Sequence, residues 1–83
     1  MHTVYILYSA KLHKYYIGYT SGNVQERLKK HLSNHQGFTS RSKDWEIVFI
    51  EYHETKSIAR KRELEIKRWK SIKKIEELIK RNS

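Results

Sequence analysis

The sequence predicts an α+β fold: a three-stranded antiparallel sheet flanked by helices, in the order β-β-α-β-α-α. Short runs of β-branched and aromatic residues at 4–8, 15–19 and 45–52 predict the three strands. A change to helical spacing from about residue 57 predicts the two helices that close the chain. With 83 residues and no proline, we expect a single domain over residues 1–83.

The first two strands are predicted to form a hairpin, because only residues 9–14 separate them. Both faces of the first strand are apolar or aromatic, with Val4 and Ile6 on one face and Tyr5 and Leu7 on the other. This pattern is typical of a central strand that is covered on both sides. Gly18 interrupts the second strand, where a glycine marks either a bulge or a close approach by a phosphate or a neighbouring helix.

A first helix is predicted after Asn23, which is a good N-cap residue and stands three positions before Glu26. Apolar residues recur there at four-residue spacing and form one stripe: Val24, Leu28 and Leu32. Arg27 and His31 are also four apart, so they share a face beside that stripe. Residues 36–44 are polar and predict a loop before the third strand.

Two further helices follow the third strand. The face of the first that should meet the sheet carries a row in which one acidic residue stands among apolar ones: Ala59, Glu63, Ile66 and Trp69. Glu65 falls about 200° from Glu63 around the helix, so we expect it to be exposed. Ser71 can cap the last helix, whose predicted buried stripe is Ile72, Ile75, Leu78 and Ile79.

The composition points to a polyanionic partner. The net charge is +9, and residues 56–83 carry 11 basic and 4 acidic residues, against 7 and 5 in the first 55. Such a skew favours nucleic acid over the alternative, a solvated lysine-rich surface. The absence of cysteine excludes disulfides and thiol catalysis and fits the cytoplasm. No apolar run approaches the roughly 18 residues of a membrane span, and the start does not resemble a signal peptide.

Several residues are candidates for chemistry, each beside a structural alternative. Glu63 on a buried face is costly unless it is paired or metal-bound, so a metal ligand and a salt bridge both remain open. Arg27 is either a phosphate clamp or a surface arginine. His31 and His35 have the spacing of zinc proteases, but Leu32 stands where those enzymes have glutamate, so His31 suits a proton shuttle or phosphate contact better.

Tyr5 and Tyr16 are strand residues and are either core side chains or part of a site. In order along the chain stand Thr3-Val4-Tyr5, Tyr16-Ile17-Gly18, Arg27 with His31, and the segment 59–63 ending in Glu63. This ordered set resembles the GIY-YIG nuclease superfamily, in particular its small stand-alone bacterial members, over about residues 3–78. Thr3 replaces the glycine that gives the first motif its name, which we expect to affect packing more than chemistry.

The resemblance implies metal-dependent hydrolysis of phosphodiester bonds. Carried over by position, Tyr5 and Tyr16 line the site, and one of them helps to deprotonate the attacking water. Arg27 stabilises charge on the phosphate, His31 assists, and Glu63 binds Mg²⁺ or Mn²⁺ as the single carboxylate that such an ion requires. Because an unperturbed tyrosine has a pKa near 10, we expect Arg27 or the metal to lower the pKa of the tyrosine that acts as base.

We expect the partner to be DNA rather than RNA, and the role to be DNA repair or processing. The sequence shows no appended DNA-binding module, so affinity is expected from phosphate contacts, with a protein partner as a further source of specificity. Tyr19 and Trp69 are candidates for stacking on unpaired bases. The alternative function is a catalytically weak nucleic-acid-binding module or partner subunit. The candidate phosphate contacts are Lys29, Lys30, Arg41, Lys43, Lys67, Lys70 and Lys74.

Overall fold

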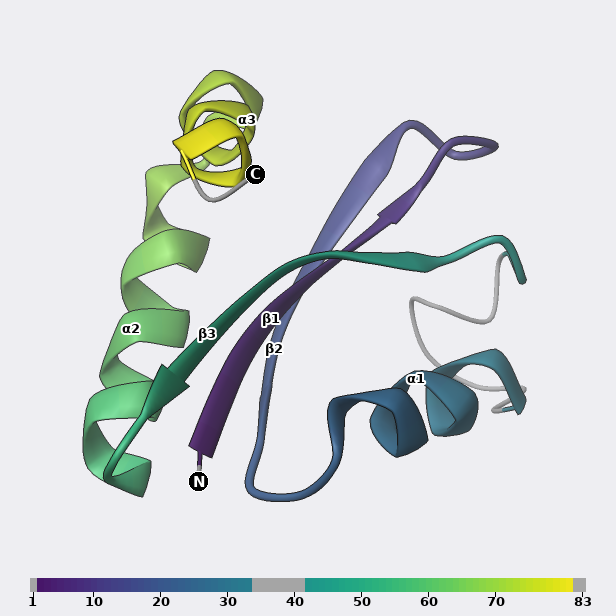
Figure 1. Ribbon diagram of the computed structural model, residues 1–83. Coiled ribbons are helices and arrows are strands. Elements are labelled where there is room, and N and C mark those ends of the chain that lie inside the picture. Colours follow the sequence, from purple (N-terminus) through teal and green to yellow (C-terminus); the bar gives the residue numbers. More distant parts are fainter. Residues whose placement is uncertain (1, 34–41, 82–83) are drawn as a thin grey trace.

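The computed structural model describes residues 2–33 and 42–81, except for the side chains of His31 and Ser33, and confirms the predicted order of elements (Figure 1). The elements are β1 (His2–Ser9), β2 (Lys14–Thr20), α1 (Val24–Ser33), β3 (Glu46–His53), α2 (Lys56–Trp69) and α3 (Ile72–Arg81). All strand pairs are antiparallel, in the order β2-β1-β3. Helix α1 lies on one side of this sheet, and α2 and α3 lie on the other.

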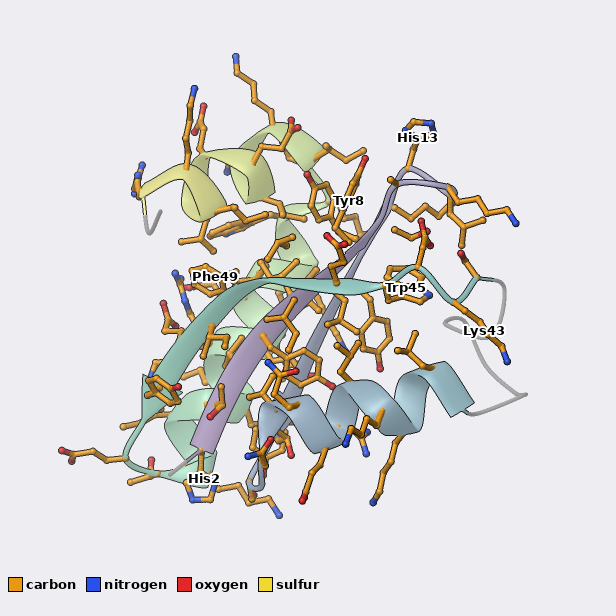
Figure 2. All side chains as sticks on the ribbon, turned by 45° about the vertical axis from the view of Figure 1, so that its right-hand side comes forward. His2, Tyr8, His13, Lys43, Trp45 and Phe49 are labelled. Carbon is orange, nitrogen blue, oxygen red and sulfur yellow. The ribbon has the colours of Figure 1, made fainter. Side chains whose placement is uncertain are left out.

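Strand β1 is the centre of the molecule, because both of its faces are buried as predicted. Val4 and Ile6 pack with Phe49 in the core under α2 and α3. Tyr5 and Leu7 pack with the buried Trp45 in a second core, under α1. Figure 2 shows Phe49, on β3, well apart from Trp45, which stands just before β3. A shift in the pairing of β1 with β3 falls between Ile6 and Leu7.

The helix starts follow the capping chemistry of the sequence. The Asn23 side chain accepts hydrogen bonds from the backbone N–H groups of Gln25 (2.8 Å) and Glu26 (3.1 Å), which confirms it as the N-cap of α1. Ser71 likewise accepts from the Lys74 N–H at 3.3 Å and caps α3. Helix α2 begins slightly earlier than predicted, because Thr55 is its N-cap. None of the described helices has the length and apolar character needed to cross a bilayer.

The predicted buried stripe of α3 is wrong at its first member. Ile75 and Leu78 are buried and Ile79 is partly buried, whereas Ile72 is 59% exposed. Helical geometry explains the difference: Ile72 is rotated roughly 90° from the midline between Ile75 and Leu78. Because Ile72 is also the first residue of α3, no preceding turn of this helix covers it.

A carboxylate holds the β1–β2 turn against the start of β3. Asp44 accepts hydrogen bonds from the hydroxyl of Ser9 (2.6 Å), the hydroxyl of Ser42 and the backbone N–H of Lys11 (2.9 Å). These bonds, chiefly that from Ser42, lower the pKa of Asp44 to about 2. The network fixes the chain just before Trp45, which was predicted to open the third strand but precedes it by one residue.

We therefore expect Asp44→Asn to lower the melting temperature by several degrees at neutral pH. Because the pKa of Asp44 in the folded protein is lower than the ordinary value of 3.8, the ionised carboxyl contributes stability above pH 3.8, and this stability is lost as the pH falls through about 2. Thermal denaturation at pH 7 and pH 2 measures both effects, and the difference between variant and wild type should shrink at pH 2. Lys43→Ala, next to it and exposed, is the control and should change little. Equal losses at both pH values would contradict the assignment.

Candidate active site

The site is built around Tyr5, whose ring lies across the edge strand β2. Tyr5 pairs with Gly18 in the β1–β2 register, and a Cβ atom added at Gly18 would lie only 2.5 Å from the Tyr5 hydroxyl oxygen. The pairing runs without a shift through Gly18, so this glycine is not a bulge. The close approach predicted at Gly18 is made by a tyrosine ring, and not by a helix. The Tyr5 hydroxyl thereby reaches over the edge of the sheet.

Arg27 reaches the same hydroxyl from α1. Its Nε donates to the Tyr5 hydroxyl oxygen at 3.4 Å, a long hydrogen bond. This bond raises the pKa of Arg27 further, so the guanidinium is charged at every accessible pH. Arg27 is otherwise exposed at the protein surface. A fixed cation with outward access suits contact with a phosphate.

Tyr16 lies on the same face of the sheet as Gly18, because strand side chains alternate. It packs against the core formed by Tyr5, Leu7 and Trp45. Its hydroxyl interacts electrostatically with both Tyr5 and Arg27. Two phenols and one guanidinium are therefore gathered at one edge of the sheet.

Glu63 approaches from α2, on the opposite side of the sheet. Its side chain is only 6% exposed, and both carboxylate oxygens are paired: Oε1 with Arg60 Nη1 at 3.2 Å and Oε2 with Lys67 Nζ at 3.2 Å. The salt-bridge alternative for Glu63 is thus present in the structure. The carboxylate also lies near enough to Tyr5 to act on its ionisation.

Burial controls the ionisation of Tyr5. Removal of the phenol from water raises its pKa, and Tyr16 and Glu63 raise it further, whereas the hydrogen bond and charge of Arg27 lower it. The net effect is a pKa above the ordinary value of 10.0. The expectation that Arg27 would leave a depressed pKa is therefore wrong for Tyr5, because desolvation outweighs the cation. Tyr5 is a neutral phenol at neutral pH.

The donor set fits one divalent cation of the Mg²⁺ type. Among residues 2–33 and 42–81, no three acidic, histidine or cysteine side chains cluster as a complete metal site. Mg²⁺, however, takes one or two protein carboxylates and fills its shell with waters and substrate phosphate oxygens. Glu63 supplies one such carboxylate, and its two partners, Arg60 and Lys67, have 60% and 47% exposed side chains that can turn to solvent.

Four of the five predicted catalytic residues are thus brought to one edge of the sheet: Tyr5, Tyr16, Arg27 and Glu63. The fifth, His31, belongs to α1, but its side chain lies outside the described part, as do His35 and Arg41 altogether. Arg60 was not predicted as a site residue. Its position three residues before Glu63 is a signal that could have found it.

The predicted phosphate contacts do not form one patch. Lys67 and Lys70 line a cleft beside Glu63, and Lys30 lines a hollow with Arg27. Lys74 lines a separate hollow next to Arg62 and Trp69. The Arg62 guanidinium carbon lies 5.6 Å from the centre of a Trp69 ring. Arg62 therefore covers the ring surface on which an unpaired base was expected to stack. The others, Lys29 and Lys43, are exposed on α1 and just before β3.

The close fit of Gly18 against Tyr5 makes a prediction. Gly18→Ala should displace the Tyr5 ring and destabilise the fold by about 1–3 kcal/mol, as overpacking does. Chemical denaturation measures the loss. In the double variant Gly18→Ala/Tyr5→Leu the shorter side chain removes the clash, so the two losses should not add. Additive losses would show that Gly18 and Tyr5 do not compete for the same space.

The comparisons with known proteins agree with this geometry. The family model described as the GIY-YIG catalytic domain matches residues 1–76 of the 83-residue chain. Neither curated proteins nor solved structures give a match. The matched stretch contains β1, β2, α1, β3 and α2, and with them Tyr5, Tyr16, Arg27 and Glu63. The chain therefore belongs to the GIY-YIG family, a family of nucleases that bind nucleic acid and hydrolyse its phosphodiester bonds.

Proposed function

We propose that this domain is a metal-dependent endonuclease that acts on DNA, with Mg²⁺ or Mn²⁺ held by Glu63. One observation carries the proposal: the Arg27–Tyr5 hydrogen bond lies over the same sheet edge that the buried carboxylate of Glu63 approaches from the other side. This arrangement brings a phosphate-binding cation, a proton-transferring phenol and a metal ligand to one place. Those are the parts that phosphodiester hydrolysis requires.

Each of the site residues has a separate role in the proposed reaction. Arg27 binds the non-bridging oxygens of the scissile phosphate and stabilises the charge that grows on them as water attacks phosphorus. Tyr5, neutral because of its burial, accepts a hydrogen bond from Arg27 Nε and so orients the guanidinium. Tyr16, as the phenolate, receives the proton of the attacking water. As the new P–O bond forms, the bridging P–O bond breaks, and the leaving oxygen takes a proton from solvent water. A divalent cation on Glu63, when bound, lowers the pKa of water and offsets phosphate charge.

A site of this kind is compatible with DNA as the substrate. A carboxylate that holds a metal serves to activate water as the nucleophile. Such a reaction needs no 2′-hydroxyl on the substrate, so deoxyribose is sufficient. A role in DNA repair or processing and a location in the cytoplasm are predictions that accompany this proposal.

A second candidate function rests on a specific observation. The Glu63 carboxylate already has two ion pairs, with Arg60 and Lys67. If these pairs persist when nucleic acid binds, the domain binds without cutting or waits for a protein partner. The experiment below separates the two functions.

The decisive experiment is a cleavage assay on labelled duplex, single-stranded and branched DNA and on RNA. Each substrate is incubated with Mg²⁺, Mn²⁺ or EDTA. The proposal expects cutting of DNA that requires the metal and stops in EDTA. Salt-sensitive binding with no cutting under any of these conditions would support the binding module instead.

The two tyrosines are expected to differ in their effect on rate. Because burial opposes the phenolate of Tyr5, we assign the base to Tyr16. Tyr16→Phe should lower kcat by roughly 10²–10⁴-fold, the usual effect of general acid–base catalysis. Tyr5→Phe should lower kcat by a smaller factor. The reverse ranking would move the base to Tyr5.

A further inference from the structure

The cleft that Lys67 and Lys70 line is lined by none of the proposed catalytic residues. It lies between the tip of the β1–β2 hairpin and the corner where α2 meets α3, and its volume is about 330 Å³. This falls within the range of roughly 300–1,000 Å³ found for small-molecule pockets. His13, labelled at the hairpin tip in Figure 2, stands at one end of the cleft.

The walls of the cleft are largely apolar. They include Tyr15 and Ile17 from β2 and Ile72 and Ile75 from α3. The Tyr15 ring is held in place by Tyr8, with ring centres 4.8 Å apart. Ile72 is 59% exposed, so the cleft leaves a large apolar side chain in contact with water. A flat apolar partner that covered this surface would remove it from water, which is favourable in free energy.

The rim of the cleft is basic. Lys14, Lys67 and Lys70 line it together with His13, and none of its described lining residues is acidic. Lys70 ends α2 in the left-handed region, at φ 49°, where the chain turns into α3. Apolar walls under a cationic rim complement a polyanion that also has apolar surfaces. A nucleotide chain, with its bases and phosphates, has both properties.

The cleft lies next to Glu63, on the side of the sheet that α2 and α3 cover. Lys67, which lines it, has its Nζ 3.2 Å from Oε2 of Glu63, the proposed metal ligand. We infer that a strand whose phosphate lies at Glu63 has a neighbouring nucleotide near Lys67, and so near the cleft. A base in a duplex is stacked and paired and cannot enter, whereas an unpaired base can.

We propose that this cleft binds an unpaired nucleobase adjacent to the scissile phosphodiester, with Tyr15 and Ile72 contacting the base and Lys67 and Lys70 contacting its phosphates. The substrate class is then single-stranded or locally unpaired nucleic acid. This inference rests on the proposed function for the position of the cut, but the binding of a base can be measured without cleavage.

The test is the binding of a fluorescent single-stranded DNA and of the matching duplex, measured by anisotropy in EDTA. Wild type should prefer the single strand. Tyr15→Leu should weaken single-strand binding roughly tenfold, the usual effect of losing one base–aromatic contact. Ile72→Gln should weaken it in the same direction. Both variants should leave duplex affinity unchanged.

Ile58→Gln is the matched control, because Ile58 is 51% exposed, lies on α2 and is not among the residues that line the cleft. Ile72 is exposed, so its variant tests the cleft even if Tyr15→Leu disturbs folding. Equal affinity of wild type for both DNAs would overturn the inference. Equal losses of single-strand affinity in Ile72→Gln and Ile58→Gln would also overturn it. A loss of duplex affinity in Ile72→Gln would overturn it too, because the cleft would then contact a groove of double-stranded DNA.

A cleavage assay with Mg²⁺ on the same single strand reports on the proposed function separately. If the protein cuts DNA but shows no preference for the single strand, the proposed nuclease function stands and the proposal for the cleft is overturned. If single-strand preference depends on Ile72 but no DNA is cut with any of the metals, the proposal for the cleft is supported and the proposed nuclease function is overturned. The two proposals can therefore fail independently.

Discussion

Replacement of Glu63 by glutamine is expected to abolish DNA cleavage while the fold is retained. Glutamine has the same shape, and its one amide oxygen can still accept a hydrogen bond from Arg60 or Lys67, each of which now lies 3.2 Å from a carboxylate oxygen. It lacks the negative charge that a divalent cation requires. Because a metal supplies several kcal/mol of transition-state stabilisation, the rate should fall by at least roughly 10²–10³-fold.

The matched control is Glu65→Gln, two positions further along α2. Glu65 is exposed, as predicted, and pairs with Arg62 in a bond that faces solvent. The Glu65→Gln variant should therefore cut DNA at the wild-type rate. Titration with Mn²⁺, followed by calorimetry in the presence of a non-cleavable DNA, should show weaker metal binding only for Glu63→Gln. Undiminished cutting by Glu63→Gln would end the metal assignment and leave Glu63 as a structural ion pair.

The sequence carries enough information for the layout of the fold. A strand whose two faces are both apolar has only one stable place, between two layers, and β1 takes it with Val4 and Tyr5 in separate cores. The caps at Asn23 and Ser71 were likewise predictable, because an oxygen-bearing side chain before an apolar period satisfies the first free N–H groups. These are local signals, and they act within a few residues.

What the sequence could not provide are distances between segments. Gly18 was ambiguous until β2 and β1 were in register, since only the register places the Tyr5 ring over it. The pKa of Tyr5 depends on how far burial outweighs one hydrogen bond from Arg27, and burial is a property of the whole packing. Ile72 was assigned to the α3 stripe by its spacing, yet it is the first residue of that helix and 59% exposed, because no preceding turn covers it.

Replacement of Arg27 by alanine is expected to separate cleavage from binding. The guanidinium bonds the Tyr5 hydroxyl through Nε, which leaves its remaining N–H donors for a phosphate. Loss of a donor aimed at developing charge typically costs roughly 10²–10³ in kcat. Because the residue lies at the surface and packs little, the melting temperature should stay close to that of wild type.

The control for Arg27→Ala is Lys29→Ala, which removes the same charge from an exposed position of α1. Both variants lose one positive charge, so non-specific affinity should fall slightly and equally in each. Only Arg27→Ala should lose the rate, and Arg27→Lys should recover part of it, since lysine restores the charge but not the planar fork. If cleavage and binding fell together in Arg27→Ala, Arg27 would be a docking contact, and charge on the phosphate would have to be stabilised by Arg60 and Lys67, which lie beside Glu63.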